Sequence, residues 1–119
     1  MTASGKASHA EGYVTSATAE AAHSEGHKTI ASGKYSHAEG NNTNASGESS
    51  HTEGNGSKAS NTAAHAEGDS TEASGAYSHA EGQNSTAQGE ASHAEGISNI
   101  TTAKGAHAEG YSNSVGGSS

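Results

Sequence analysis

The chain has 119 residues and a net charge of −8 with its nine histidines neutral, and it contains no Phe, Trp, Pro or Cys. A chain this poor in large apolar residues normally cannot bury enough surface to offset its backbone entropy, so disorder is the default expectation. The missing cysteines exclude disulfides and thiol chemistry. The five scattered lysines form no basic stripe for nucleic acid, and no apolar run reaches the length of a membrane span.

Strict internal repetition overturns the expectation of disorder. A histidine recurs every fourteen residues and a glutamate follows it two places later, without insertion or deletion along the chain. His27 is the only histidine outside this register. The repeated residues are His9, Glu11, His23, Glu25, His37, Glu39, His51, Glu53, His65, Glu67, His79, Glu81, His93, Glu95, His107 and Glu109.

Each fourteen-residue unit divides into two sevens with the consensus (S/T)-x-A-x-G-x-x. Alanine recurs every seven residues from Ala3 to Ala108, and glycine follows two places later from Gly5 to Gly117. The departures are Ser24, Thr52, Thr101 and Val115 at the alanine slot, and Ala19, Asn61 and Ala103 at the glycine slot.

The seven-residue period does not indicate a coiled coil, which needs bulky apolar residues at two positions per seven. A glycine in every heptad would also cost a helix about 1 kcal/mol each time. The pattern predicts short strands instead, at residues 1–5, 8–12, 15–19 and every seven residues onward to 113–117. Within each strand Ser, Ala and Gly face one side and the two variable residues face the other. Glycine can take the positive φ that begins a corner, and pairs such as Asn41–Asn42 are good turn residues.

Each repeat is therefore predicted to form one coil of a narrow, all-β, parallel solenoid. Eight coils stacked about 4.8 Å apart would make a rod on the order of 40 Å long. The alanine columns are expected to point inward, where only small side chains fit. Such a core buries little apolar surface per residue, so the fold should gain from burial against other chains.

Repeats such as TIASGKYSHAEG (residues 29–40) and TEASGAYSHAEG (residues 71–82) resemble the YadA-like head repeats of trimeric autotransporter adhesins. That family's pattern is S-x-A-x-G-x-x-S-x-A-x-G, and the likeness extends from about Thr2 to Gly117. The final NSVGG (residues 113–117) resembles the family's N-S-V-A-x-G phrase. The resemblance implies a left-handed parallel β-roll that packs as a homotrimer around a common axis. It predicts one head domain over residues 2–117, of about eight repeats, and a tail at 118–119.

The outward face that carries His and Glu at every coil is uniform, whereas the opposite face carries a mixed set such as Ile30, Lys58 and Glu72. A uniform face indicates a surface that matches something regular, and we predict that its sixteen residues form the trimer interface. The other interpretations are an exposed ladder, binding of Zn²⁺ or Ni²⁺, either adventitious or as a dedicated function, and direct ligand recognition. No dedicated metal site or cofactor is predicted. Protonation of a buried histidine column should change stability, in a direction that the sequence does not indicate.

Catalysis is not expected. Ser8, His9 and Glu11 are the residue types of a nucleophile, base and orienter, but alternation along a strand places Ser8 and His9 on opposite sides. A calcium-binding roll is also disfavoured, because its nine-residue period and recurrent aspartates are missing and Asp69 is the only aspartate. An ice-binding solenoid would need regular rows of Thr, which residues such as Lys58 and Glu72 interrupt.

The function predicted from these observations is structural and adhesive: a rigid head segment of a trimeric fibre that attaches to a host surface or extracellular matrix. The resemblance places such a fibre at the cell surface or outer membrane, with no membrane contact by this segment. Similar repeats occur in phage tail fibres, which makes a receptor-binding segment on a virion the alternative. Because Met1 is followed directly by repeats, the chain is expected to be a fragment of a longer protein.

Overall fold

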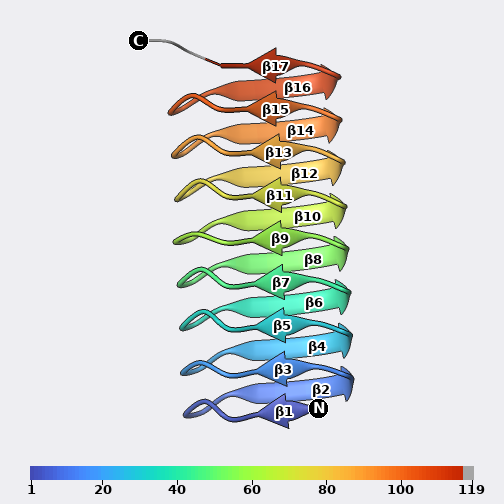
Figure 1. Cartoon of the computed structure of the whole chain (residues 1–119), viewed down its shortest axis with the longest axis vertical. Helices are drawn as coiled ribbons and strands as arrows, with labels where there is room; N and C mark the ends of the chain where they lie inside the picture. Colours follow the sequence, from blue (N-terminus) through green and yellow to red (C-terminus); the bar gives the residue numbers. More distant parts are fainter. Residues whose placement is uncertain (117–119) are drawn as a thin grey trace.

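Strands and turns alone build the part of the chain that the computed structural model describes, residues 1–116 (Figure 1). Gly117 of the predicted domain and the predicted tail at 118–119 lie outside the described residues. Over the same 116 residues, no helix is long and apolar enough to cross a membrane.

The strands form two parallel sheets, one of long strands and one of short strands, and the chain alternates between them. The long-strand sheet consists of β2 (His9–Tyr13), β4 (His23–His27), β6 (His37–Asn41), β8 (His51–Asn55), β10 (His65–Asp69), β12 (His79–Gln83), β14 (His93–Ile97) and β16 (His107–Tyr111). The short-strand sheet consists of β1 (Thr2–Ala3), β3 (Ser16–Ala17), β5 (Ile30–Ala31), β7 (Asn44–Ala45), β9 (Lys58–Ala59), β11 (Glu72–Ala73), β13 (Thr86–Ala87), β15 (Ile100–Thr101) and β17 (Ser114–Val115).

Successive coils pair in register at a fourteen-residue offset, so identical residues lie side by side. Between β10 and β12, His65 pairs with His79 and Glu67 pairs with Glu81. The molecule measures 42 × 23 × 11 Å, close to the rod length predicted from strand spacing. The prediction of an all-β parallel solenoid of about eight fourteen-residue coils is confirmed (Figure 1).

The space between the sheets is filled by small side chains. Ala38 of β6 and Ala45 of β7 are fully buried, as the sequence predicts for the alanine columns. Buried Ser and Thr border these columns and donate hydrogen bonds to corner carbonyls: Thr43 Oγ1 to Glu39 O at 3.0 Å, and Ser50 Oγ to Gly47 O at 2.7 Å. These bonds satisfy hydroxyl groups that burial would otherwise leave unpaired.

The corners differ in one respect from the sequence prediction. Glycines that follow the glutamates have positive φ as expected, for example Gly40 at +104°. A second residue with positive φ, in the left-handed helical region, lies two places after each glycine slot. It is mostly not glycine, as at Asn42 (φ +60°) and Ser49 (φ +57°). This second corner position recurs every seven residues, and its exposed, variable side chains conceal it in the sequence.

The three departures at the glycine slot have a conformational explanation. Ala19, Asn61 and Ala103 all fall in the half of the repeat that leads out of the short-strand sheet, and none of them has positive φ. The equivalent Gly33 and Gly47 have ordinary φ as well. The backbone conformation of this half therefore does not require glycine, although a Cβ added at Gly33 or Gly47 would overlap a carbonyl oxygen of the next coil. The glycines after the glutamates are never replaced in this chain.

Replacing Ala63 by glycine should stabilise the fold by about 0.5–1 kcal/mol, because Ala63 is exposed and strained at φ +52°. Ala76 lies at a corner without positive φ, so Ala76→Gly should be destabilising instead. Urea unfolding of both variants measures the difference. Equal destabilisation by the two changes would contradict the assigned corner conformation.

Candidate functional site

All sixteen residues predicted for the interface lie on the outer side of the long-strand sheet, and we call them the His/Glu column. Strand alternation brings them together: in β6, Ala38 points into the core while His37 and Glu39 point outward. In-register pairing then places each histidine beside the histidine of the next coil, and each glutamate beside the next glutamate.

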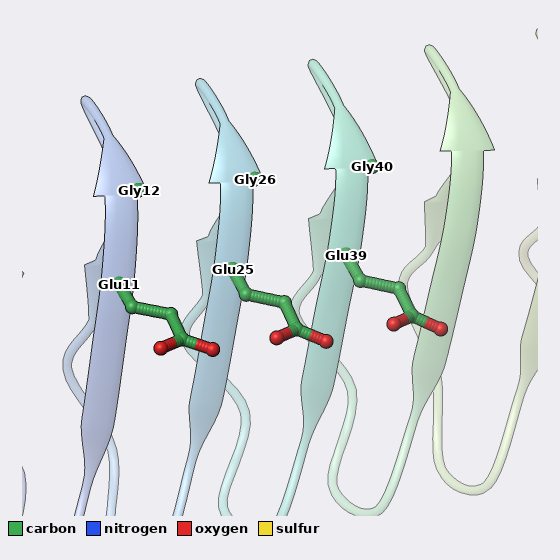
Figure 2. A pocket seen from close by; sticks show the side chains of 6 residues that line it. All are labelled: Glu11, Gly12, Glu25, Gly26, Glu39 and Gly40. Carbon is green, nitrogen blue, oxygen red and sulfur yellow. The ribbon is translucent and has the colours of Figure 1, made fainter.

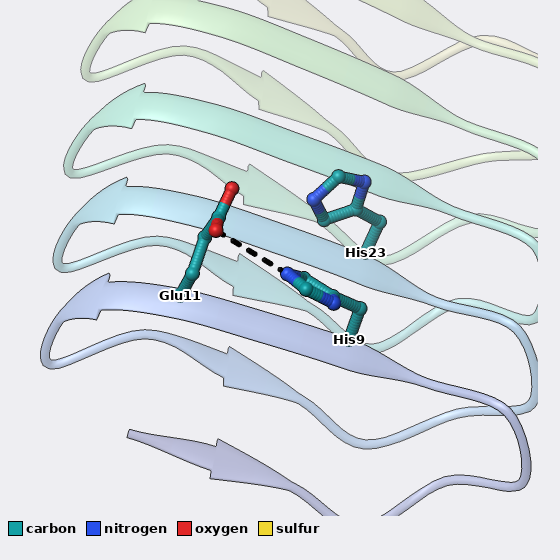
Figure 3. Close-up of side chains that lie close together, drawn as sticks. All are labelled: His9, Glu11 and His23. Carbon is teal, nitrogen blue, oxygen red and sulfur yellow. Dashed lines mark ion pairs between the residues drawn. The ribbon is translucent and has the colours of Figure 1, made fainter.

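The imidazole rings form a continuous stack along the rod. From His23 to His107, consecutive ring centroids are 4.6–4.9 Å apart and consecutive planes lie within 13° of parallel. The first pair differs, since His9 meets His23 edge to face at 76° (Figure 3). The stack repeats the strand spacing, so the backbone ladder fixes where each ring lies.

Most interior histidines contact two glutamates, one on their own strand and one on the preceding coil, whereas His23 contacts only Glu25 and His51 only Glu39 within 4.0 Å. His79 Nε2 is 3.2 Å from Glu67 Oε1 and 3.9 Å from Glu81 Oε2. His93 repeats this arrangement, 3.3 Å from Glu81 and 3.8 Å from Glu95. At the first coil, His9 pairs with Glu11 of its own strand at 3.4 Å (Figure 3). The column is therefore a continuous lattice of imidazoles and carboxylates.

Several imidazole nitrogens in this lattice have no hydrogen-bond partner. The Nε2 atoms of His23, His37, His51 and His65 are shielded from solvent and unpaired. The His37 side chain as a whole is 35% exposed, so only its inner nitrogen is covered. An unpaired buried nitrogen is costly, and it marks a place where a partner group or ion would be stabilising.

A groove of about 440 Å³ runs beside the glutamates at the first coils (Figure 2). The carboxylates project from neighbouring strands in parallel, and the glycines that follow them leave the backbone uncovered. The groove therefore concentrates negative charge along the sheet. Its lining residues are Glu11, Gly12, Glu25, Gly26, Glu39 and Gly40.

Protons are distributed unequally along the glutamates. Hydrogen bonding with the flanking Glu53 and Glu81 raises the pKa of Glu67 from 4.5 to about 8. Hydrogen bonds from Glu95 and Glu67 lower the pKa of Glu81 to about 2, and the bond from Glu67 lowers the pKa of Glu53. The pKa of Glu95 is raised again by Glu81. Raised and lowered carboxyl pKa values thus alternate, which relieves the repulsion between stacked carboxylates.

The histidines at the centre of the column are held neutral. Burial is the main cause that lowers the pKa of His65 and His79 below 6.5, and the neighbouring imidazoles lower it further. The carboxylates of Glu53 and Glu81 act in the opposite direction and do not outweigh burial. A protonated histidine in the stack would face other imidazoles on both sides, which is unfavourable.

The column also contains sets of potential metal ligands. One set combines Glu39, His51 and Glu53, whose ligand atoms lie within 4.8 Å of one another, and another combines His65, Glu67 and His79. Imidazole and carboxylate together suit borderline divalent ions such as Zn²⁺.

Of the three residues considered for catalysis, His9 and Glu11 pair, but Ser8 is directed away from them. Ser8 Oγ donates to the Gly5 carbonyl at 2.7 Å, on the inner side of its strand. His9 lies on the outer side with Glu11. The geometry therefore provides no nucleophile–base contact at this position.

A second ladder, not anticipated from the sequence, runs along one corner. His27 Nδ1 lies 2.8 Å from Asn41 Oδ1, Asn41 Nδ2 donates to Asn55 Oδ1 at 3.0 Å, and Asn55 Nδ2 donates to Asp69 Oδ1 at 3.2 Å. The Tyr13 ring stacks on His27 at 5.4 Å. The fourteen-residue spacing of these polar residues is the signal that could have revealed it. The ladder ties neighbouring coils together in the region that contains the off-register histidine.

In comparisons with known proteins, no family model, no curated protein and no solved structure matches this chain.

Proposed function

We propose that the chain is a rigid structural segment in the head of a trimeric surface fibre. The outer flanks of this head attach to a host surface or matrix. In this proposal the roll is left-handed, as in YadA-like heads, and three chains pack with their His/Glu columns around a common axis. The observation that carries the proposal is the unbroken, in-register His/Glu column over eight long strands.

The half-buried side chains of the column support this packing. Interior residues such as His37 and Glu39 keep 35% and 31% of their side-chain surface exposed on the outer side of the sheet. A neighbouring chain that covers this surface with the same residues meets the same polar groups at every coil. Polar lattices of this kind give register and specificity to an interface more than they give stability.

The core supports assembly for a second reason. The largest fully buried side chains of the described residues are Asn99 and several threonines, so a single chain buries little apolar surface. The molecule is only 11 Å across its shortest dimension, and most of its residues reach the surface. Packing three such rolls together would add the buried area that one roll lacks.

The mass in solution, measured by light scattering after size exclusion, should be three times the chain mass of 11.6 kDa. Glu67→Arg should convert the trimer to monomer, because it places three cations where we expect the axis. Glu72 lies exposed on the short-strand sheet, so Glu72→Arg makes the same change of charge on the opposite side and should leave the trimer intact. A monomeric wild-type chain, or a trimer that survives Glu67→Arg, would contradict the proposed axis.

A further inference from the structure

The spacing of ligand atoms in the His/Glu column matches the coordination shell of a metal ion. His79 Nε2 lies 3.2 Å from Glu67 Oε1 and 3.9 Å from Glu81 Oε2. Around tetrahedral Zn²⁺, with bonds of about 2.0–2.2 Å, neighbouring ligand atoms are about 3.4 Å apart. Shifts of a few tenths of an ångström in flexible glutamate side chains would therefore close the shell. The Nε2 atoms of His23 and His51 are shielded and have no hydrogen-bond partner, which a bound ion would provide.

We propose that the His/Glu column is a row of binding sites for a borderline divalent ion of the Zn²⁺ class, each formed by one imidazole and two carboxylates of a single chain. The imidazole provides Nε2, the glutamate of the same strand provides Oε2, and the glutamate of the preceding coil provides Oε1. Water completes the tetrahedral shell, as is usual where the protein contributes three ligands.

Two histidines do not share an ion in this arrangement. The parallel rings of His65 and His79 are 4.7 Å apart, and in-register stacking keeps their Nε2 atoms about equally separated. Two zinc–nitrogen bonds span at most about 4.2 Å, so one ion cannot reach both rings without disrupting the stack. One histidine per ion is the arrangement that leaves the stack and the backbone ladder unchanged.

The number of ions follows from the glutamates. Each ion takes two carboxylates in this arrangement, which together balance its charge, and the eight column glutamates taken two at a time provide for four ions per chain. Only one way of pairing glutamates of adjacent coils uses each glutamate once: it starts with Glu11 and Glu25 and continues along the column. The histidine on the second coil of each pair then completes the site, which places the ions at His23, His51, His79 and His107, on alternate coils.

The mixed donor set selects the class of ion. Imidazole favours Zn²⁺, Ni²⁺ and Cu²⁺, whereas Ca²⁺ and Mg²⁺ prefer oxygen donors alone. The alternate-coil arrangement separates neighbouring ions by two strand spacings, about 9.6 Å, which limits their mutual repulsion.

The test is the number of Zn²⁺ ions bound per chain, measured by equilibrium dialysis and elemental analysis at pH 7.5. We expect four ions for the natural chain and three for His79→Gln. Without His79, no assignment of ions to the remaining histidines uses all eight glutamates in adjacent pairs. His65→Gln is the matched control: it removes an equivalent ring from the same stack, yet it leaves the four sites complete. His27→Gln removes a histidine outside the column and should also retain four ions.

Zinc-edge X-ray absorption should show a shell of nitrogen and oxygen at about 2.0–2.1 Å. Absence of binding, or equal losses in the His79 and His65 variants, would overturn the proposal. The ligands of each ion come from one chain, so the site does not depend on the proposed trimer. Light scattering on the same samples reports the assembly separately: four ions on a monomer would refute the trimer alone, and a trimer without zinc would refute the metal sites alone.

Discussion

Gly54→Ala should destabilise the protein by about 3 kcal/mol, the largest effect that we expect from a single methyl group. Gly54 has φ +98°, which lies beyond the left-handed helical region that other residues can occupy. A Cβ added there would overlap the carbonyl oxygen of Gly68 and lie 2.9 Å from the Gly68 amide nitrogen. Both Gly68 atoms belong to the backbone of the parallel ladder, so they cannot move aside without breaking strand pairing.

Gly105→Ala is the matched control. Gly105 also has positive φ, at +69°, but nothing lies within 4 Å of a Cβ added there. Only the conformational cost of about 1 kcal/mol should therefore appear. Urea unfolding monitored by circular dichroism measures both variants. Similar losses of about 1 kcal/mol in each would show that the close approach of successive coils is not as tight as the structure indicates.

Stability should pass through a maximum between pH 4.5 and 6.5, as measured by thermal unfolding between pH 4 and 8.5 in metal-free buffer. Two groups of residues with opposite pKa shifts produce the maximum. The histidines dominate the acidic side and the protonated glutamates dominate the alkaline side.

On the acidic side, His65 and His79 have folded pKa values below the unfolded value of 6.5. At these two histidines the unfolded chain therefore binds more protons as the pH falls below 6.5, and their contribution to the stability of the folded chain is lost. His65 faces His51, His79 and the carboxylates of its own and the preceding coil, and desolvation by burial outweighs the attraction of Glu53 and Glu81. Below pH 4.5, the lowered pKa of Glu81 adds a further loss.

On the alkaline side, the pKa of Glu67 is about 8 in the folded chain and 4.5 when unfolded. The folded chain binds more protons in this window, so the contribution of Glu67 is complete below pH 4.5 and is lost as the pH rises to 8. Between pH 5 and 6.5 this gain on acidification, to which the raised pKa of Glu95 adds, opposes the loss from the two histidines. Above pH 6.5 it acts without opposition from them.

Two variants separate the limbs of the curve. Glu67→Gln should flatten the alkaline limb, and the double change His65→Gln with His79→Gln should flatten the acidic limb. Glu72→Gln makes the same substitution on the exposed short-strand sheet, away from the column, and should change neither limb. A curve that stays flat from pH 5 to 8 would contradict the partial burial of the column.

The arrangement of side chains on the two sheets could be predicted from sequence because of periodicity. The fourteen-residue recurrence of His37, Glu39 and their equivalents permits one register only, and alternation assigns Ala38 to the interior. Because alanine side chains are small, a core of alanine requires the two sheets to lie close together. The His/Glu column was therefore predictable as one continuous face.

The corners were less predictable. The left-handed residues recur every seven positions, yet Asn42, Ser49 and Ala63 share no side-chain property, because what the corner requires is a backbone conformation. The corner ladder from His27 to Asp69 was missed for a related reason: its members differ in type, and the hydrogen bonds that link them arise only because successive coils stack at fourteen-residue spacing.

The sequence by itself determined the strand period, the coil length and the outward placement of every column residue, since these follow from local alternation and exact repetition. Only the tertiary structure decided the distances between imidazole and carboxylate, the unpaired Nε2 atoms and the direction of each pKa shift. Those quantities depend on how closely successive coils approach and how far each side chain is removed from water, which a repeat pattern does not specify.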